Sequence, residues 1–160
     1  MANYSDFSIE LRGNPFQLRA AVDEFTKLTP WNYSISEIYH EELISEPPTW
    51  VITGSGRWGI DVESLINLAN KYQLSGSITD AEFGSNFFIQ VELENGEITY
   101  SCNTDYMSDE HYNFDPDNQW WLDSYYYALE EPDEYPEVIE FLLKHQIITQ
   151  EQLDEQSRIS

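Results

Sequence analysis

The chain has 160 residues, 41% of them hydrophobic and 15% aromatic, so it is long and apolar enough for a core and lacks the composition of a disordered acidic tail. Its 30 acidic residues outweigh seven lysines and arginines, and the net charge of −23 disfavours direct binding to nucleic acid or an anionic membrane. One cysteine excludes an internal disulfide, and with no basic leader and no run of about 18 apolar residues we expect a cytoplasmic protein without a membrane span.

The N-terminal segment is patterned as a strand followed by a helix. Apolar and polar residues alternate over 4–12, which predicts a half-buried strand. Asn14 and Pro15 are typical of a helix start. Apolar residues then recur at helical spacing, which predicts an amphipathic helix over 15–28.

The next part of the chain is less regular. A short strand is expected near 33–39, and the β-rich residues 49–53 predict a central strand. The glycines and serine of 54–56 are typical of a turn. Asp61 is then placed to cap a second amphipathic helix over 62–72.

Three strands in succession are predicted after this helix, over 77–83, 87–94 and 97–102. Asn95-Gly96, between the last two, is the strongest short hairpin signal in the chain. The order strand, helix, strand, helix and meander predicts an α+β fold, with helices on one face of an antiparallel sheet.

Several short motifs in this half resemble a known family. They are a strand bearing a tryptophan (Trp50-Val-Ile-Thr), a helix ending in Tyr72, the run Asp80-Ala-Glu-Phe-Gly84 and the hairpin Glu94-Asn-Gly96. Together they resemble the Api ninety-two-like proteins of plasmids and phages, although those relatives commonly carry a proline before the helix where this chain has Gly59-Ile60. The resemblance covers residues 4–103 and implies a ferredoxin-like core and a mobile-element origin, with no catalytic residues.

The character of the chain changes after Cys102, so we predict two parts, a ferredoxin-like core over 1–103 and an acidic, aromatic-rich helical extension over 104–160 packed on it. Helices are expected over 119–131, with Asn118 as its cap, and over 136–144. Residues 149–152 resemble a capping box that starts a terminal helix.

The extension holds a dense run of negative charge. Residues 105–140 carry twelve carboxylates, nine large aromatic residues and no lysine or arginine. Such a surface favours a basic protein partner, with the aromatic rings as anchors. The candidate partner-binding residues are Asp105, Asp109, Glu110, Asp115, Asp117, Trp120, Asp123, Tyr126, Tyr127, Glu130, Glu131, Asp133 and Glu134.

Signatures of catalysis and of cofactor binding are weak. The acids around His111 lack the central glycine of a calcium-binding loop, so a solvated acidic loop is the preferred interpretation and no metal or cofactor is expected. A reactive thiolate needs an electropositive setting, and the residues that follow Cys102 are acidic, which disfavours a nucleophile. The glycine-rich residues 54–57 lack the lysine and hydroxyl residue of a phosphate-binding loop.

The hypothesis that best fits these patterns is a non-enzymatic, phage- or plasmid-encoded inhibitor that imitates the charge of a phosphate backbone. It would block the nucleic-acid site of a basic host defence protein, as an anti-CRISPR or anti-restriction protein of the DNA-mimic type. An immunity protein or antitoxin that neutralises a basic toxin would present the same surface. The same composition is also compatible with a metal-dependent enzyme, or with acidity that serves solubility alone.

Overall fold

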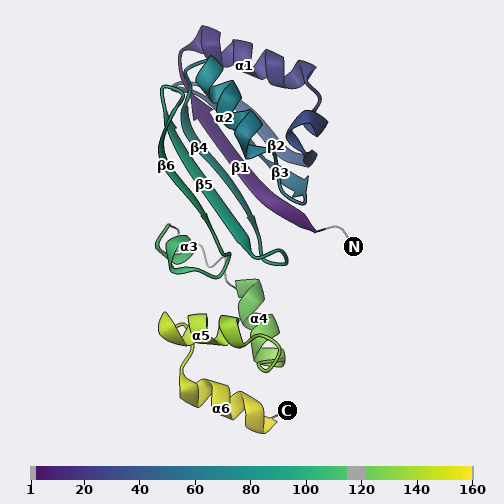
Figure 1. Ribbon diagram of the computed structural model, residues 1–160, viewed down its shortest axis with the longest axis vertical. Helices are drawn as coiled ribbons and strands as arrows, with labels where there is room; N and C mark the ends of the chain where they lie inside the picture. Colours follow the sequence, from purple (N-terminus) through teal and green to yellow (C-terminus); the bar gives the residue numbers. More distant parts are fainter. Residues whose placement is uncertain (1–2, 115–121, 160) are drawn as a thin grey trace. The chain divides into compact units, whose positions relative to one another are not determined.

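The computed structural model describes residues 3–114 and 122–159 (Figure 1). The chain divides into two compact units, unit 1 (Met1–Tyr106) and unit 2 (Met107–Ser160). The division follows Tyr106, whereas the sequence pattern placed it after residue 103.

Unit 1 is an α+β unit built on a six-stranded sheet. The strands run in the order β2-β3-β1-β4-β5-β6, and every neighbouring pair is antiparallel. The predicted antiparallel α+β architecture is therefore confirmed. Its elements are β1 (Tyr4–Arg12), α1 (Pro15–Lys27), the 3-10 helix η1 (Pro30–Tyr33), β2 (Ile35–Ser45), β3 (Pro48–Arg57), α2 (Val62–Lys71), β4 (Ser75–Glu82), β5 (Phe87–Glu94) and β6 (Glu97–Thr104).

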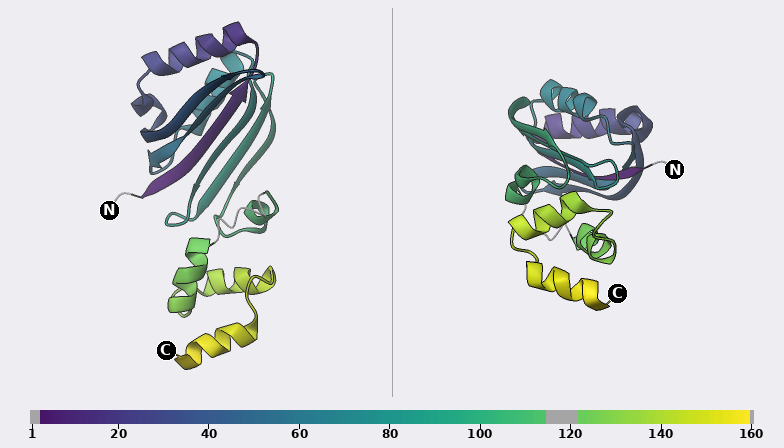
Figure 2. Two further views of the ribbon diagram at one scale, coloured as in Figure 1. Left: turned by 180° about the vertical axis from the view of Figure 1, so that it is seen from behind. Right: turned by 60° about the horizontal axis from the view of Figure 1, so that its bottom comes forward.

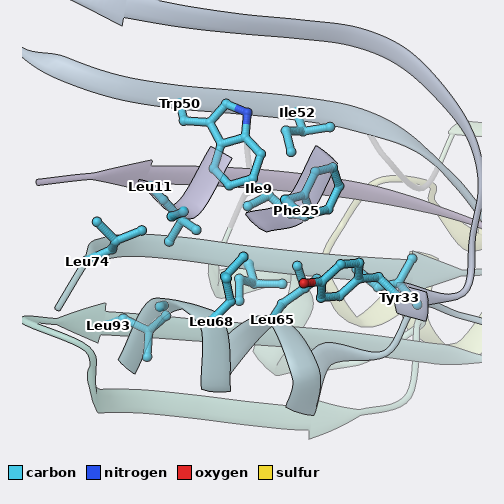
Figure 3. Packing of buried hydrophobic residues seen from close by; sticks show 14 of the residues in the cluster. Ile9, Leu11, Phe25, Tyr33, Trp50, Ile52, Leu65, Leu68, Leu74 and Leu93 are labelled. Carbon is cyan, nitrogen blue, oxygen red and sulfur yellow. The ribbon is translucent and has the colours of Figure 1, made fainter. Parts of the chain in front are cut away.

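The alternating pattern of β1 explains why one face of this sheet carries the core. Every second residue of β1 is buried, and Ile9 lies opposite Ile52 of β3 and Ile78 of β4. Both α1 and α2 cover this face, and seen from behind the strands lie in front of α2 (Figures 1 and 2). Leu65 of α2 points toward the buried strand residues (Figure 3).

Aromatic residues join the helical layer to the sheet. The ring of Phe25 lies with its centroid 5.0 Å from that of Trp50, edge to face, and 5.0 Å from that of Tyr33, stacked (Figure 3). Trp50 is buried and its indole Nε1 donates a hydrogen bond of 3.1 Å to Oε1 of Glu41. This partner keeps the only polar atom of the indole satisfied.

Side-chain caps start both helices of unit 1, as the sequence predicted. Asn14 Oδ1 accepts a hydrogen bond of 2.9 Å from the backbone N–H of Phe16, and Asp61 Oδ1 accepts one of 3.1 Å from that of Ser64. Each bond satisfies an amide that has no partner within its helix.

Two predictions for unit 1 were wrong. Residues 54–56 do not form a turn, because β3 continues to Arg57. Gly54 is needed for close approach of the strands, since a Cβ there would lie 2.0 Å from the carbonyl oxygen of Glu37. The other wrong prediction is the extent of the short strand near 33–39, which is present but longer, as the eleven-residue β2 with bulges near Glu37 and Ile38.

Unit 2 is helical, as predicted. It contains α3 (Asp109–Phe114), α4 (Leu122–Glu130), α5 (Pro136–Lys144) and α6 (Gln150–Ile159). The predicted capping box is confirmed, because the backbone N–H of Gln152 donates to Oγ1 of Thr149 (3.2 Å) and the N–H of Thr149 donates to Oε1 of Gln152 (2.9 Å). The predicted cap Asn118 lies outside the described residues.

Helix α3 was missed, since its residues were read as a solvated loop. Asp109 and Glu110 occupy its first turn, where carboxylates are favoured, and the hydroxyl of Ser108 accepts a hydrogen bond of 3.2 Å from the N–H of His111. Throughout the described part of the chain, no helix combines the length and the apolar character needed to cross a membrane.

Candidate partner-binding site

Unit 2 presents most of the described carboxylates of the predicted site around the connection between α4 and α5. This connection is closed by backbone hydrogen bonds from Glu131 N to Tyr127 O (3.1 Å) and from Glu134 N to Glu131 O (3.0 Å). The backbone that carries these carboxylates is therefore fixed by helical structure and by hydrogen bonds in the link. We call six exposed residues here the acidic corner: Glu130, Glu131, Asp133, Glu134, Glu137 and Glu140.

Two tyrosine rings lie on α4, within one helical turn or so of the first residue of the acidic corner. Tyr126 and Tyr127 are 58% and 55% exposed, whereas Ala128 is fully buried. Successive helical residues are turned by about 100°, so three adjacent positions cannot share one face. The helix buries Ala128 and leaves both phenol rings accessible, three and four positions before Glu130 in the sequence.

The packed face of α5 keeps its acidic residues outward. Val138, Phe141 and Leu142 are buried, and they alternate at helical spacing with exposed Glu137 and Glu140. Burial of this apolar face fixes the rotation of α5. The negative side of the helix is therefore a consequence of its packing.

Asp109 has a different role from the other candidate residues. Its carboxylate lies 2.6 Å from Nζ of Lys144 and 2.9 Å from Nε2 of His145, and it thereby joins α3 to the end of α5. The hydrogen bond from Lys144, and then that from His145, lowers the pKa of Asp109. The ring of Tyr112 stacks on that of His145, with centroids 4.1 Å apart. Asp109 therefore acts within unit 2.

The remaining candidate residues fall into two groups. Asp105 and Glu110 are exposed, at the end of unit 1 and in α3 respectively. Asp115, Asp117 and Trp120 lie outside the described residues, as does the side chain of Asp123.

The sequence patterns did not reveal a pair of buried carboxyl groups in unit 1. Asp80 and Glu82 lie on the core face of β4, where the alternation from Ile78 signals inward positions. Oδ2 of Asp80 accepts a hydrogen bond of 2.9 Å from the N–H of Ile60, while Oδ1 of Asp80 and Oε2 of Glu82 have no partner among the described residues. Burial raises the pKa of Asp80, and nearby Asp6 adds to the effect. Such a group favours its protonated form.

The described residues offer little for metal or nucleophilic chemistry. Across 3–114 and 122–159, no three His, Cys, Asp or Glu side chains are grouped so that they could hold a metal ion. Cys102 is half-buried in β6. Residues 54–56 are part of a strand and cannot form a phosphate-binding loop at a helix N-terminus.

The acidic corner with Tyr126 and Tyr127 is thus the feature of the described structure that best fits a binding role. No family model, no curated protein and no solved structure matches this chain.

Proposed function

We propose that this protein is a non-enzymatic binding protein whose acidic corner occupies the nucleic-acid site of a basic protein. The observation that carries the proposal is the acidic corner itself, where six exposed carboxylates fall within residues 130–140 and no lysine or arginine lies among them. They stand on the end of one helix, a hydrogen-bonded link and the first turns of the next helix.

Charge density supports a target that normally receives phosphates. Duplex DNA carries one negative charge per about 1.7 Å of its axis, and proteins bind it with rows of Lys and Arg. The acidic corner places six carboxylates within eleven residues, so at a helical rise of about 1.5 Å per residue it carries one charge per roughly 3 Å, about half the density of duplex DNA. Opposite charges steer such partners together and raise the association rate.

The exposed tyrosines supply apolar contact area, and with it binding affinity that the carboxylates alone do not provide. Ion pairs at an exposed surface contribute little affinity, while aromatic rings buried at the centre of an interface are frequent hot spots. Tyr126 and Tyr127 lie four and three positions before Glu130, the first residue of the acidic corner, and are more than half exposed. They are the anchors in this proposal, and the carboxylates provide steering and orientation.

We further propose that the target is a host defence protein, so that this chain acts as an anti-CRISPR or anti-restriction protein. The topology of unit 1 supports the ferredoxin-like core implied by the resemblance described above, and the mobile-element origin is carried by that resemblance alone. Its first six elements, apart from η1, follow the order β1-α1-β2-β3-α2-β4, with the strands arranged β2-β3-β1-β4. A ferredoxin-like unit has this order of elements, and here β5 and β6 would extend it.

The test is affinity capture with a variant that reverses the charge of the acidic corner. In this variant Glu130, Glu131, Asp133 and Glu134 become lysine, which changes the net charge from −23 to −15 because each of four substitutions adds two. The matched control reverses four exposed acids of unit 1, Glu10, Asp23, Glu92 and Glu94, and has the same net charge. Both proteins and the wild type are immobilised, exposed to a bacterial lysate at low salt and eluted with rising salt.

The proposal expects the wild type and the control to retain the same nucleic-acid-binding protein, and the acidic-corner variant to lose it. Equal loss in both variants would mean that net charge rather than the acidic corner is responsible, and equal capture by all three proteins would mean that the acidic corner does not hold the partner. Capture of a toxin that duplex DNA does not displace would instead favour an immunity protein.

A further inference from the structure

The strand β2 forms one edge of the unit 1 sheet and has a free side. It pairs with β3 alone, and among the described residues no backbone group bonds to its other side. Its first half is bulged near Glu37 and Ile38, but from His40 to Ser45 the register with β3 is regular. Bulges protect an edge from pairing, so the regular second half is the part of β2 that is open to another strand.

A groove runs beside this regular half of β2, between it and α1. Its volume is about 360 Å³, and its walls are mainly apolar. Phe16 is 86% exposed at the start of α1, and Ile44 on the strand is 37% exposed. Other lining residues are Leu18, Arg19, Leu43 and Pro48. An exposed phenylalanine beside a free strand edge leaves apolar area that an added side chain would cover.

The negative charge of the β2 edge favours a positively charged partner. The strand β2 and its following turn carry Glu37, Glu41, Glu42 and Glu46 and no lysine or arginine. Glu41 accepts a hydrogen bond from Trp50, while Glu42 is exposed and its Oε2 lies 3.5 Å from Nε2 of His40. A second copy of this chain is disfavoured, because antiparallel pairing of two β2 strands would bring their glutamates together.

We propose that β2 is a second docking site, at which an extended segment of a basic partner protein adds a strand to the sheet. Its aliphatic side chains enter the groove beside Phe16 and Ile44, and its lysine or arginine side chains meet Glu42 and the neighbouring carboxylates. The backbone gives affinity through strand pairing, while the groove and the charges give specificity. The site does not depend on the acidic corner, so either proposal can fail alone.

The probe is a fluorescent seven-residue peptide that alternates lysine and valine. The six residues from His40 to Ser45 extend roughly 20 Å at about 3.3 Å each, so a peptide of this length spans the regular edge. Two control peptides keep the charge: in one, serine replaces valine, and in the other every backbone nitrogen is methylated. Binding is followed by fluorescence anisotropy and by the backbone amide NMR signals of β2.

The proposal expects the parent peptide to bind and to shift the amide signals of 40–45, and both control peptides to bind at least about tenfold more weakly. Phe16→Ala and Glu42→Lys should each weaken binding of the parent peptide by a similar factor. Both side chains are exposed, so the fold should survive. Glu92→Lys, an equally exposed acid on β5, should leave binding unchanged.

Several results would overturn the inference. Absence of binding by the parent peptide would overturn it. Equal binding of the three peptides would also overturn it, because it would indicate a general attraction between basic peptides and an acidic protein. Equal effects of Glu42→Lys and Glu92→Lys, or amide shifts confined to unit 2, would place the peptide elsewhere.

Discussion

Asp80 carries a carboxyl group in the core of unit 1 with one oxygen unpartnered among the described residues. Because burial raises its pKa, the folded state holds the proton more tightly than the unfolded chain does. The resulting stability is fully present below the usual pKa of about 4 and is lost as the pH rises through the folded-state pKa.

Asp80→Asn should therefore stabilise the protein at pH 8 and not at pH 4. The amide has no charge to desolvate, and its oxygen can still accept the hydrogen bond from Ile60. We expect a gain of about 1 kcal/mol in the free energy of unfolding at pH 8, measured by urea denaturation. Glu92→Gln, on an exposed position, is the control and should show no such dependence. A loss of stability that is equal at both pH values would contradict this account.

Asp109 should show the opposite dependence on pH. Its pairing with Lys144 and His145 lowers its pKa, so the stability it contributes is present above the usual pKa of an aspartate and is lost as the pH falls through the lowered value. Asp109→Asn should reduce Tm at pH 7, and the difference from wild type should shrink at low pH and in high salt. Glu110→Gln, the exposed neighbour, should leave Tm unchanged or raise it. A pH-independent deficit would indicate that packing, not charge, is lost.

At the scale of elements, the sequence was informative wherever the apolar pattern was regular. The bounds of β1, β5 and α5 agree with those predicted, because each has clear alternation or helical spacing and a clear boundary such as Pro136. The bulged strand β2 was predicted too short and the polar helix α3 was missed, since neither has a regular apolar pattern. The glycines of β3 were predicted to form a turn because glycine is typical both of turns and of strand positions where a neighbouring backbone comes close.

A glycine in β4 provides a test of the central strand pairing. Gly76 has φ +147°, and a Cβ there would lie 1.9 Å from the carbonyl oxygen of Glu10. Gly76→Ala should therefore push β4 from β1 and destabilise unit 1 by about 3 kcal/mol, as measured by denaturant unfolding. Gly84→Ala is the matched control, because its Cβ would meet side-chain atoms and no backbone: Oε1 of Glu82 at 3.0 Å and the side chain of Asn3 at 3.6 Å. Similar stabilities for the two variants would show that the β1–β4 approach is looser than described.

At the scale of the whole molecule, negative charge is concentrated in the second half. Residues 72–143 hold seventeen acids and no lysine or arginine, so repulsion should oppose compaction. Raising sodium chloride from about 20 to about 300 mM should shorten the Debye length and raise Tm by a few degrees. The acidic-corner variant, with a net charge of −15, should show a smaller rise. An unchanged Tm for the wild type would mean that its acids are already paired or too far apart to repel.

The candidate site was only partly readable from the sequence. The density of acids in 105–140 and the solvent exposure of some neighbouring tyrosines follow from composition and helical geometry. The sequence did not reveal that Asp109 pairs with Lys144, 35 positions away, because such a contact depends on how α3 and α5 pack. Nor did it reveal the groove beside β2, whose walls come from two separate elements.

The central claim is that the acidic corner competes with nucleic acid for one site on its partner. The most direct measurement is displacement of a labelled DNA duplex from the purified captured protein by increasing amounts of this chain, at several salt concentrations. The account predicts full displacement by the wild type and the unit 1 charge-reversal control, weakening steeply as salt rises, and none by the acidic-corner variant. A ternary complex in which the duplex stays bound, or equal displacement by the acidic-corner variant, would contradict it.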